Sequence, residues 1–254
     1  MNTSISLVFA AACAAASAAA HALPLTDNAS VEFFAGTNAA VAGDFRGNDL
    51  AFQLPDSAGA ITYNHLNLDD AYHGKYTAGA ELDFKLAPQL TAFGRAAYSQ
   101  FDGSTERVGT FEPQSLTPLS TVMARFGDTA SRELALGMRY NFLEGARVQP
   151  FVGAAIGATR LDATYATIEP VGNLDATHVR LSNTSSVFEQ RLETGVQFSP
   201  WTNFDLRLTA AASHVDGVGR SDDPNLALVG LDNVHGDVRG HWNYPAELGG
   251  VWHF

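Results

Sequence analysis

Cysteine is almost absent from this chain of 254 residues, whose single cysteine is Cys13. Cys13 lies in an apolar, alanine-rich run from Ile5 to Ala20 that contains no acidic or basic residue. The run is followed by Ala20-His21-Ala22, the small-x-small pattern typical of a signal-peptidase site. We therefore predict a cleavable signal peptide over residues 1–22, with an uncleaved anchor or a disordered tail as the alternatives. The exported remainder has no cysteine, which excludes a disulfide-stapled secreted domain.

Long hydrophobic runs and basic residues are also scarce. After the predicted signal peptide, no apolar run approaches the roughly 20 residues that a membrane-spanning helix needs, which excludes a helical membrane protein. The chain has 15 Lys and Arg residues against 27 Asp and Glu residues, a net charge of −12. This charge would repel phosphates, so we expect no nucleic-acid partner. A membrane β-barrel remains possible, because its strands alternate apolar and polar residues.

Alternation with a period of two is what the rest of the chain shows. In SRELALGMRYNF, residues 131–142, one parity is wholly apolar from Leu134 to Phe142 and the other carries Glu133 and Arg139. KYTAGAELDFKL, residues 75–86, has the same split, with Glu81 on its polar parity. Side chains two residues apart share one face of a β-strand. Both stretches are therefore predicted strands with one apolar face and one charged face.

The lengths and spacing of such segments favour a membrane barrel over a soluble sandwich. Most are 12 to 14 residues long, whereas a soluble strand has about 5 or 6 and a tilted membrane strand needs roughly 9 to 11. The eight predicted segments are 30–42, 74–87, 89–101, 131–143, 147–160, 186–198, 203–214 and 238–254. Tight turns alternate with four long, polar connections, 43–73, 102–130, 161–185 and 215–237. Short turns at one end and long loops at the other are the layout of an outer-membrane barrel.

The strand count has one alternative. Leu226-Ala227-Leu228-Val229 is an apolar stretch within the last long connection, and it could add a hairpin. We therefore expect an all-β, up-and-down antiparallel transmembrane barrel of eight strands, with ten as the alternative.

Charges of both signs collect on the polar parity, which in a closed barrel faces a narrow lumen. An unpaired buried charge is costly, so we expect a connected network of ion pairs there. The alternative is an open sheet whose charged face meets water. The expected members of the lumen network are Glu81, Arg95, Glu133, Arg139, Arg191, Glu193, Arg207 and Glu247.

This pattern resembles the small eight-stranded outer-membrane β-barrels of Gram-negative bacteria, of the OmpA transmembrane-domain, OmpX or opacity-protein type. It extends over nearly all of residues 23–254, which we expect to form one domain, and over the last segment YPAELGGVWHF. The resemblance implies a monomer in the cell outer membrane, in contact with outer-membrane lipid and lipopolysaccharide. It also implies that Trp252 and Phe254 are the assembly signal read by periplasmic chaperones and the barrel-assembly machinery. Pro245 and Gly249-Gly250 depart from a regular final strand.

An eight-stranded barrel is filled by side chains, which argues against a wide diffusion channel. We expect a non-enzymatic protein whose rigid barrel presents long acidic loops for surface binding or envelope integrity, with a narrow pore as its nearest variant. We expect no cofactor, bound metal or catalytic residue. The acidic loops could also bind Ca²⁺ or Mg²⁺, but no loop has the spacing of a known calcium motif.

The alternative function is an outer-membrane enzyme that acts on lipid A or peptides. Its strongest candidate pair is Ser213-His214, with Asp216 as the nearest acid. Adjacent residues on a strand point to opposite faces, so Ser213 and His214 cannot form a catalytic dyad with each other. The Asp and His residues of the loops do not have the spacing of a compact ligand motif. These residues are His65, Asp69, Asp70, His73, His235 and Asp237.

Overall fold

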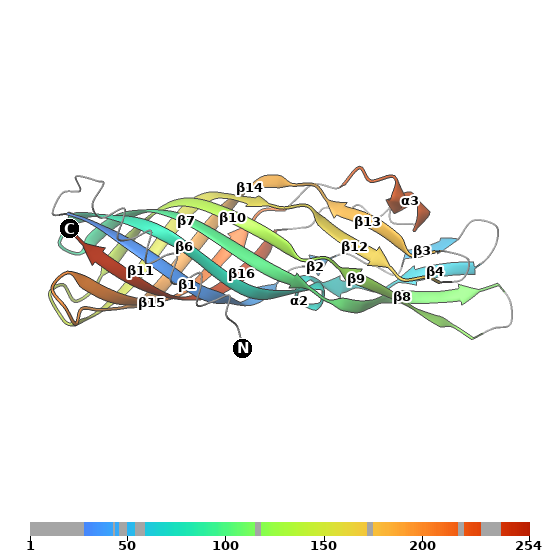
Figure 1. Cartoon of the computed structure of the whole chain (residues 1–254), viewed down its shortest axis with the longest axis horizontal. Helices are drawn as coiled ribbons and strands as arrows, with labels where there is room; N and C mark the ends of the chain where they lie inside the picture. The colour runs from blue at the N-terminus through green and yellow to red at the C-terminus, as the bar shows by residue number, and fades with distance from the viewer. Residues whose placement is uncertain are drawn as a thin grey trace.

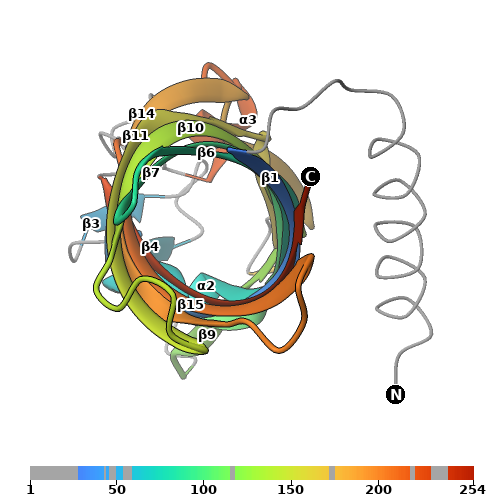
Figure 2. The ribbon, with the colours of Figure 1, turned by 90° about the vertical axis from the view of Figure 1, so that its left-hand side faces the viewer.

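Eight long strands of the computed structural model close into one antiparallel barrel (Figures 1 and 2). Each strand pairs with its neighbours in chain order, and the last pairs with the first. The barrel strands are β1 (Ala29–Ala42), β6 (Tyr72–Ala87), β7 (Leu90–Gly103), β10 (Thr129–Asn141), β11 (Val148–Leu161), β14 (Ser185–Phe198), β15 (Phe204–Val215) and β16 (His241–His253). The structure describes residues 28–42, 44–45, 50–53, 59–114, 118–171, 175–217, 221–229 and 240–254.

The predicted barrel of eight strands is confirmed, and seven of its strands begin and end within two residues of the predicted segments. The alternative of ten strands is wrong. Three of the four residues of the apolar stretch that suggested an extra hairpin belong to the short helix α3 (Asn225–Leu228) instead. Among the described residues, no helix is long and apolar enough to cross a membrane. The predicted signal peptide, 1–22, lies outside the described residues.

The strands are staggered as closure of a barrel requires. Hydrogen-bonded neighbours can be followed around the ring from Arg160 of β11 through β10, β7, β6, β1, β16, β15 and β14. The path returns to β11 at Pro150, ten residues from where it began. A stagger of this kind goes with strands tilted by about 35–45° to the barrel axis. A row of neighbours therefore runs from the long-loop end towards the short-turn end as it crosses from β11 to β1.

The irregularity predicted for the last strand is mild. Pro245 lies within β16 and is paired with Asn38 of β1. Proline has no N–H for the ladder, and the β1–β16 register shifts by one residue directly beyond this pair, between Asn38 and Val41. Pairing continues on both sides, so the barrel is closed despite the proline.

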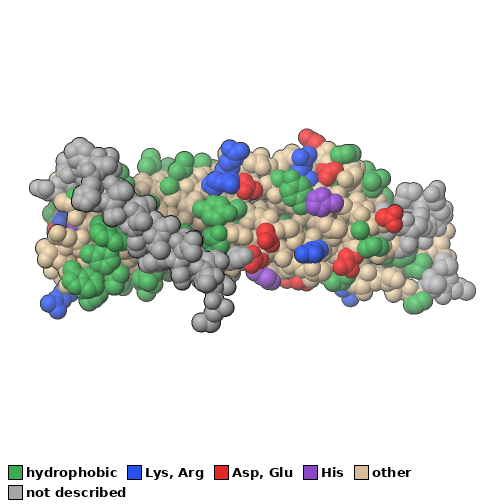
Figure 3. Space-filling view, viewed as in Figure 1, with side chains coloured by type: hydrophobic (Ala, Val, Ile, Leu, Met, Phe, Trp, Pro, Cys, Tyr) green, Lys and Arg blue, Asp and Glu red, His purple; other side chains and the backbone are tan. Residues whose placement is uncertain are grey.

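The outward side of the barrel is an apolar band, seen as hydrophobic side chains over the barrel half of the molecule in Figure 3. Leu134 and Leu136 are 68% and 71% exposed, which a water-facing surface of a soluble protein rarely shows in such a continuous band. Exposed aromatic rings border the band at both ends, as in membrane barrels. At the long-loop end they are Tyr98, Phe188, Trp242 and Tyr244, and at the short-turn end Phe84, Tyr140, Phe142, Phe198 and Trp201.

The long connections differ from the extended polar loops that the sequence predicts, because they continue as β-structure beyond the barrel (Figure 1). A six-stranded sheet forms there, in the order β13-β12-β9-β8-β4-β3, beside a two-stranded sheet, β2-β5. Its strands are β3 (Leu50–Gln53), β4 (Gly59–Tyr63), β8 (Thr105–Pro113), β9 (Ser120–Phe126), β12 (Thr164–Ile168) and β13 (Thr177–Ser182). The smaller sheet consists of β2 (Asp44–Phe45) and β5 (Leu66–Asn67), and α2 (Leu68–Ala71) follows it. We call these elements, together with α3, the extension.

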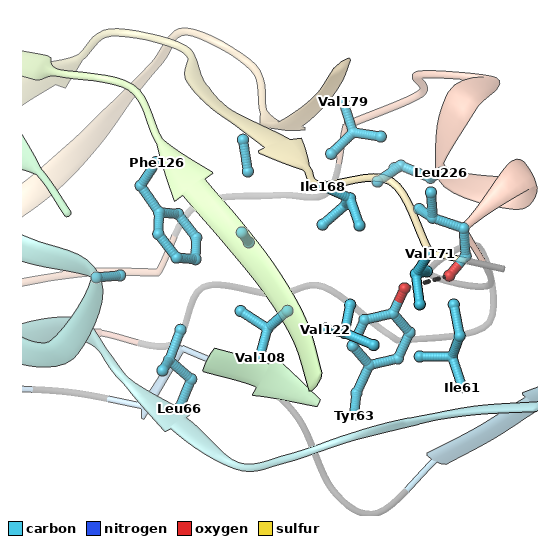
Figure 4. Close-up of a cluster of buried hydrophobic side chains, with 14 of the residues drawn as sticks. Ile61, Tyr63, Leu66, Val108, Val122, Phe126, Ile168, Val171, Val179 and Leu226 are labelled. Carbon is cyan, nitrogen blue, oxygen red and sulfur yellow. Dashed lines mark hydrogen bonds between the residues drawn. The ribbon is translucent and has the colours of Figure 1, made fainter. Parts of the chain in front are cut away.

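The extension has an apolar core of its own (Figure 4). Ile61, Val122 and Val179 come from three different strands and are completely buried in it. The Tyr63 hydroxyl reaches across this core and donates a hydrogen bond of 2.5 Å to the backbone carbonyl of Val229, beside α3. Burial raises the pKa of that hydroxyl above its usual value. The last long connection is thereby fastened to β4, so the extension is a packed unit.

Candidate functional site

The barrel interior is filled by a connected network of buried charges. Alternation of side chains along β6, β7, β10, β14, β15 and β16 directs one parity inward, and that parity carries four arginines and their carboxylate partners. All eight residues predicted for the lumen network lie in it. They are Glu81, Arg95, Glu133, Arg139, Arg191, Glu193, Arg207 and Glu247.

One half of the network is centred on Arg139 and Arg207. The Arg139 guanidinium lies 2.6 Å from a Glu193 carboxylate oxygen and 2.8 Å from one of Glu81. Arg207 lies 3.1 Å from Glu81 and 2.8 Å from Asp83, and it also pairs with Glu32. Arg139 also lies 3.4 Å from Asp83, so each guanidinium meets three carboxylates, which suits its planar fork of donors.

The other half is centred on Arg95 and Arg191. Arg95 makes two hydrogen bonds to the Glu247 carboxylate, of 2.6 and 3.1 Å, and a third of 3.0 Å to Glu133. Arg191 donates to Glu247 at 2.9 Å and to Glu193 at 3.2 Å. Because Glu193 also holds Arg139, it joins the two halves into one network.

Three buried phenylalanines support the arginines. Arg95 lies over the Phe34 ring at 3.9 Å from its centroid, and Arg139 lies between the rings of Phe93 and Phe151, at 4.6 and 4.9 Å. Cation–π contacts of this kind strengthen when they are shielded from water. Charge and aromatic surface together fill the width of the lumen.

Glycines make room for these rings. A Cβ added to Gly79 would lie 2.5 Å from the Phe34 ring, and one added to Gly195 would lie 2.6 Å from the Phe151 ring. The same Cβ atoms would come within 2.2 Å of backbone carbonyl oxygens on the neighbouring strands. Any larger residue at Gly79 or Gly195 would collide with both the ring and the backbone of a neighbouring strand, so only glycine fits at these two positions.

The lumen continues as hydrogen-bonded polar groups towards the short-turn end. Gln197 accepts a hydrogen bond of 3.0 Å from Arg207 and donates one to Asp205. His253, next to the C-terminus, lies 2.8 Å from Asp205. The network therefore extends from the middle of the barrel to its short-turn rim.

On the long-loop side of Arg95 and Arg191 lies a polar gap of about 30 Å³. Asn38, Thr159 and Ser213 are among the side chains that line it. A gap of this volume accommodates about one water molecule. The paired arginines and carboxylates of the lumen network lie between this gap and the short-turn end.

The arrangement does not resemble an empty metal centre. Carboxylate oxygens of Glu32, Glu81 and Asp83 come within 4.8 Å of one another, close enough to share a cation. Arg207 contacts all three, and its guanidinium takes the place that a cation would need.

The candidate catalytic pair is separated by the barrel wall. Ser213 is buried in the lumen, whereas His214 faces outward and packs against the Trp242 ring with centroids 5.0 Å apart. Asp216 is 3.9 Å from His214, also outside the lumen. The pair therefore has the opposite orientations expected of neighbours in a strand.

Among the described loop candidates, no three side chains lie close enough together to share a metal ion. Asp70 accepts a 3.0 Å hydrogen bond from the Asn67 backbone N–H at the start of α2, and His65 lies 3.2 Å from the Asn67 side chain. Asp69 and His73 are exposed on the same segment. His235 and Asp237 lie outside the described residues.

Several residues of the lumen are absent from the predicted set. Glu32, Phe34, Phe93 and Phe151 all lie on the inward parity of their strands and are at most 3% exposed. Their signal in the sequence is the same alternation that identifies the charges. In β1 the alternation is hard to recognise, because the adjacent residues Phe33 and Phe34 are both aromatic although they lie on opposite faces of the strand.

No family model and no curated protein sequence matches the chain. Several solved structures are similar to it at 9–10% sequence identity. Neisserial surface protein A has 10% identity and a TM-score of 0.43, over 89% of this chain and 97% of that one. Ail, the attachment invasion locus protein of Yersinia pestis, has 10% identity and a TM-score of 0.37, over 89% and 99%. The outer membrane protease OmpT from Escherichia coli has 9% identity and a TM-score of 0.40, over 90% and 97%. The closed eight-stranded barrel is established by the chain's own strand pairing.

Proposed function

We propose that this chain is a non-enzymatic outer-membrane protein whose filled barrel holds a rigid, β-structured extension at the cell surface for binding. The observation that carries the proposal is the continuity of barrel and extension. β7 leads through Ser104 into β8, and β12 follows β11 after two residues. A binding surface built on such strands keeps its shape better than one on free loops.

The proposed location is supported by the contrast between the two sides of the barrel wall. The outward side is apolar and bordered by aromatic rings, whereas the inward side is charged and fully paired at its centre. This arrangement suits a bilayer outside and a polar interior, and long connections face the cell exterior in barrels of this kind. We infer that the signal peptide over 1–22 directs export, that the protein is a monomer, and that it contacts outer-membrane lipid and lipopolysaccharide.

Exposure of the extension can be tested in intact cells. The chain should fractionate with the outer membrane and should migrate differently in detergent gels before and after boiling, because a closed barrel resists unfolding until it is heated. An epitope inserted at residues 115–117, between β8 and β9, should bind antibody on unbroken cells. A chain that stays in the periplasm, or an epitope reached only after lysis, would contradict the proposal.

Assembly is proposed to depend on the C-terminal residues. Figure 1 places the C-terminus at the short-turn end, and the Trp252 ring packs there against Phe33 and Phe204, with centroids 6.0 and 4.8 Å away. Deleting Phe254 should lower the outer-membrane yield severalfold while export across the inner membrane continues. The measurement is the ratio of heat-modifiable to periplasmic protein, and an unchanged ratio would refute the role of Phe254.

A further inference from the structure

Two arginines lie side by side on the outward face of the barrel. Arg132 of β10 and Arg160 of β11 are direct neighbours in the strand register, and both are exposed. Like charges placed directly opposite each other destabilise a strand pair. Asp162 offsets part of this repulsion through a 2.7 Å ion pair with Arg132, but none of the described side chains forms an ion pair or hydrogen bond with Arg160. The pair therefore presents an excess of positive charge on a protein that is otherwise acidic.

Their height on the barrel is that of the aromatic border at the long-loop end. Arg132 is the neighbour of Tyr98 in the register, and its guanidinium lies 5.9 Å from the centroid of that ring. The next outward residue of β10 towards the short-turn end is Leu134, which is 68% exposed and belongs to the apolar band. The two arginines are therefore at the depth where lipid headgroups of the outer leaflet lie.

A strip of small side chains leads from the arginines into the apolar band. The row of neighbours that contains Arg160 and Arg132 continues through Tyr98 to Ala78 and Ala35. Because of the stagger of the barrel, this row descends towards the short-turn end. The adjacent row adds Ala96 and Ala80. The four alanines line one outward-facing apolar groove between the larger side chains Phe33, Leu134 and Leu248.

We infer that Arg132 and Arg160 bind the phosphate of a phosphorylated, acylated lipid of the outer leaflet, whose hydrocarbon chain lies along the alanine groove. Two adjacent guanidinium groups match the charge and the hydrogen-bonding geometry of a phosphate. The groove supplies an apolar surface directly below them. The inference requires that the chain spans an outer membrane, but it is independent of what the extension binds.

Phosphate recognition can be tested on the whole refolded protein in detergent. The probe is bisphosphorylated lipid A, compared with the same lipid after removal of both phosphates, and the readout is bound lipid by native mass spectrometry. The double variant R132Q/R160Q should lower affinity for the phosphorylated probe at least about tenfold, because it removes charge-assisted hydrogen bonds. The dephosphorylated probe should bind the unaltered protein as weakly as the phosphorylated probe binds the variant.

A second double variant, K85Q/R147Q, is the matched control. It removes the same charge from exposed residues at the opposite, short-turn end of the barrel, and it should bind lipid A as the unaltered protein does. Equal affinity of both double variants, or equal binding of the two probes, would overturn the inference. The gel shift on boiling establishes that each variant is folded.

Separate experiments test the groove and the source of the phosphate. Ala80→Trp should weaken lipid A binding, whereas Ala154→Trp, on the outward face of β11 away from the groove, should not. Equal losses of affinity in the two variants would show that the groove is not part of the lipid site.

Inorganic phosphate in millimolar excess should fail to displace lipid A. Displacement would assign the arginine pair to free phosphate and refute the lipid.

Discussion

At the scale of single residues, the lumen depends on arginines that each hold several carboxylates. Arg139 is 2% exposed and joins Glu81, Asp83 and Glu193. Attraction between buried charges offsets their loss of water only when every member is paired. Removing one arginine leaves its carboxylate partners buried and unpaired. The loss in free energy of unfolding should therefore exceed what the intact ion pairs contribute to it.

Arg139→Gln should destabilise the barrel by about 3–5 kcal/mol, the usual cost of leaving buried partners uncompensated. The measurement is reversible urea unfolding in lipid vesicles. Lys85→Gln is the control, because it breaks the 2.9 Å pair with Glu144 where both side chains are over one-third exposed, and it should cost at most about 1 kcal/mol. Similar losses in the two variants would show that the network does not hold the barrel together.

In the extension, one carboxylate gives an expected pH dependence. Asp223 accepts hydrogen bonds from the backbone N–H groups of Arg180, at 2.6 Å, and Asn225, at 3.0 Å, and these hold the pKa of its carboxyl below the ordinary value of 3.8. Because the folded pKa is the lower one, the contact stabilises the fold above pH 4 and is lost as the pH falls through the folded pKa. The NMR shift of the Arg180 amide should therefore titrate with a midpoint below 3.8 and stay flat in Asp223→Asn. A midpoint at or above that value would contradict the assignment.

Alternation alone was enough to predict eight members of the lumen network. It identifies parity but not which inward residues touch, so the choice of partners, such as Glu193 between Arg139 and Arg191, needed the strand register. The Phe rings that support the arginines were missed because an aromatic residue suits the lipid face equally well by composition.

At the scale of elements, the barrel strands were predictable and the extension was not. A membrane strand must alternate over about ten residues, which gives a long signal. The extension strands are shorter, and β8 contains a register shift between Arg107 and Gly109 that breaks its period. Val122, Ala124 and Phe126 of β9 do alternate, and all three are buried, but a run of seven residues is weak evidence within a polar connection.

The packed core of the extension predicts that it can melt separately from the barrel. Ile61→Ala removes a fully buried side chain and should destabilise the extension by about 2–5 kcal/mol. The expected result is faster proteolysis between residues 59 and 126, with an unchanged gel shift of the barrel on boiling. Thr62→Ala, at the adjacent and less buried position of β4, is the control and should leave proteolysis unchanged. Loss of the gel shift in Ile61→Ala would mean that barrel and extension unfold as one unit.

At the scale of the whole molecule, the barrel and the extension place their apolar side chains in opposite ways, although barrel strands lead directly into extension strands. The barrel has an apolar exterior and a charged interior, whereas the extension has a buried apolar core of its own. Each part therefore suits a different surrounding, lipid for the barrel and water for the extension. The boundary between them is the level of Arg132 and Arg160, where the inferred lipid site lies.

The proposed function requires that the paired side chains close the lumen to ions, because a barrel that only holds a binding surface needs no channel. Single-channel recording of the refolded protein in a planar bilayer tests it most directly. With the network of ion pairs intact across the lumen, we predict no steady conductance. Steady, cation-selective conductance would contradict the account, because the carboxylates that outnumber the arginines in the described lumen would then line an open pore.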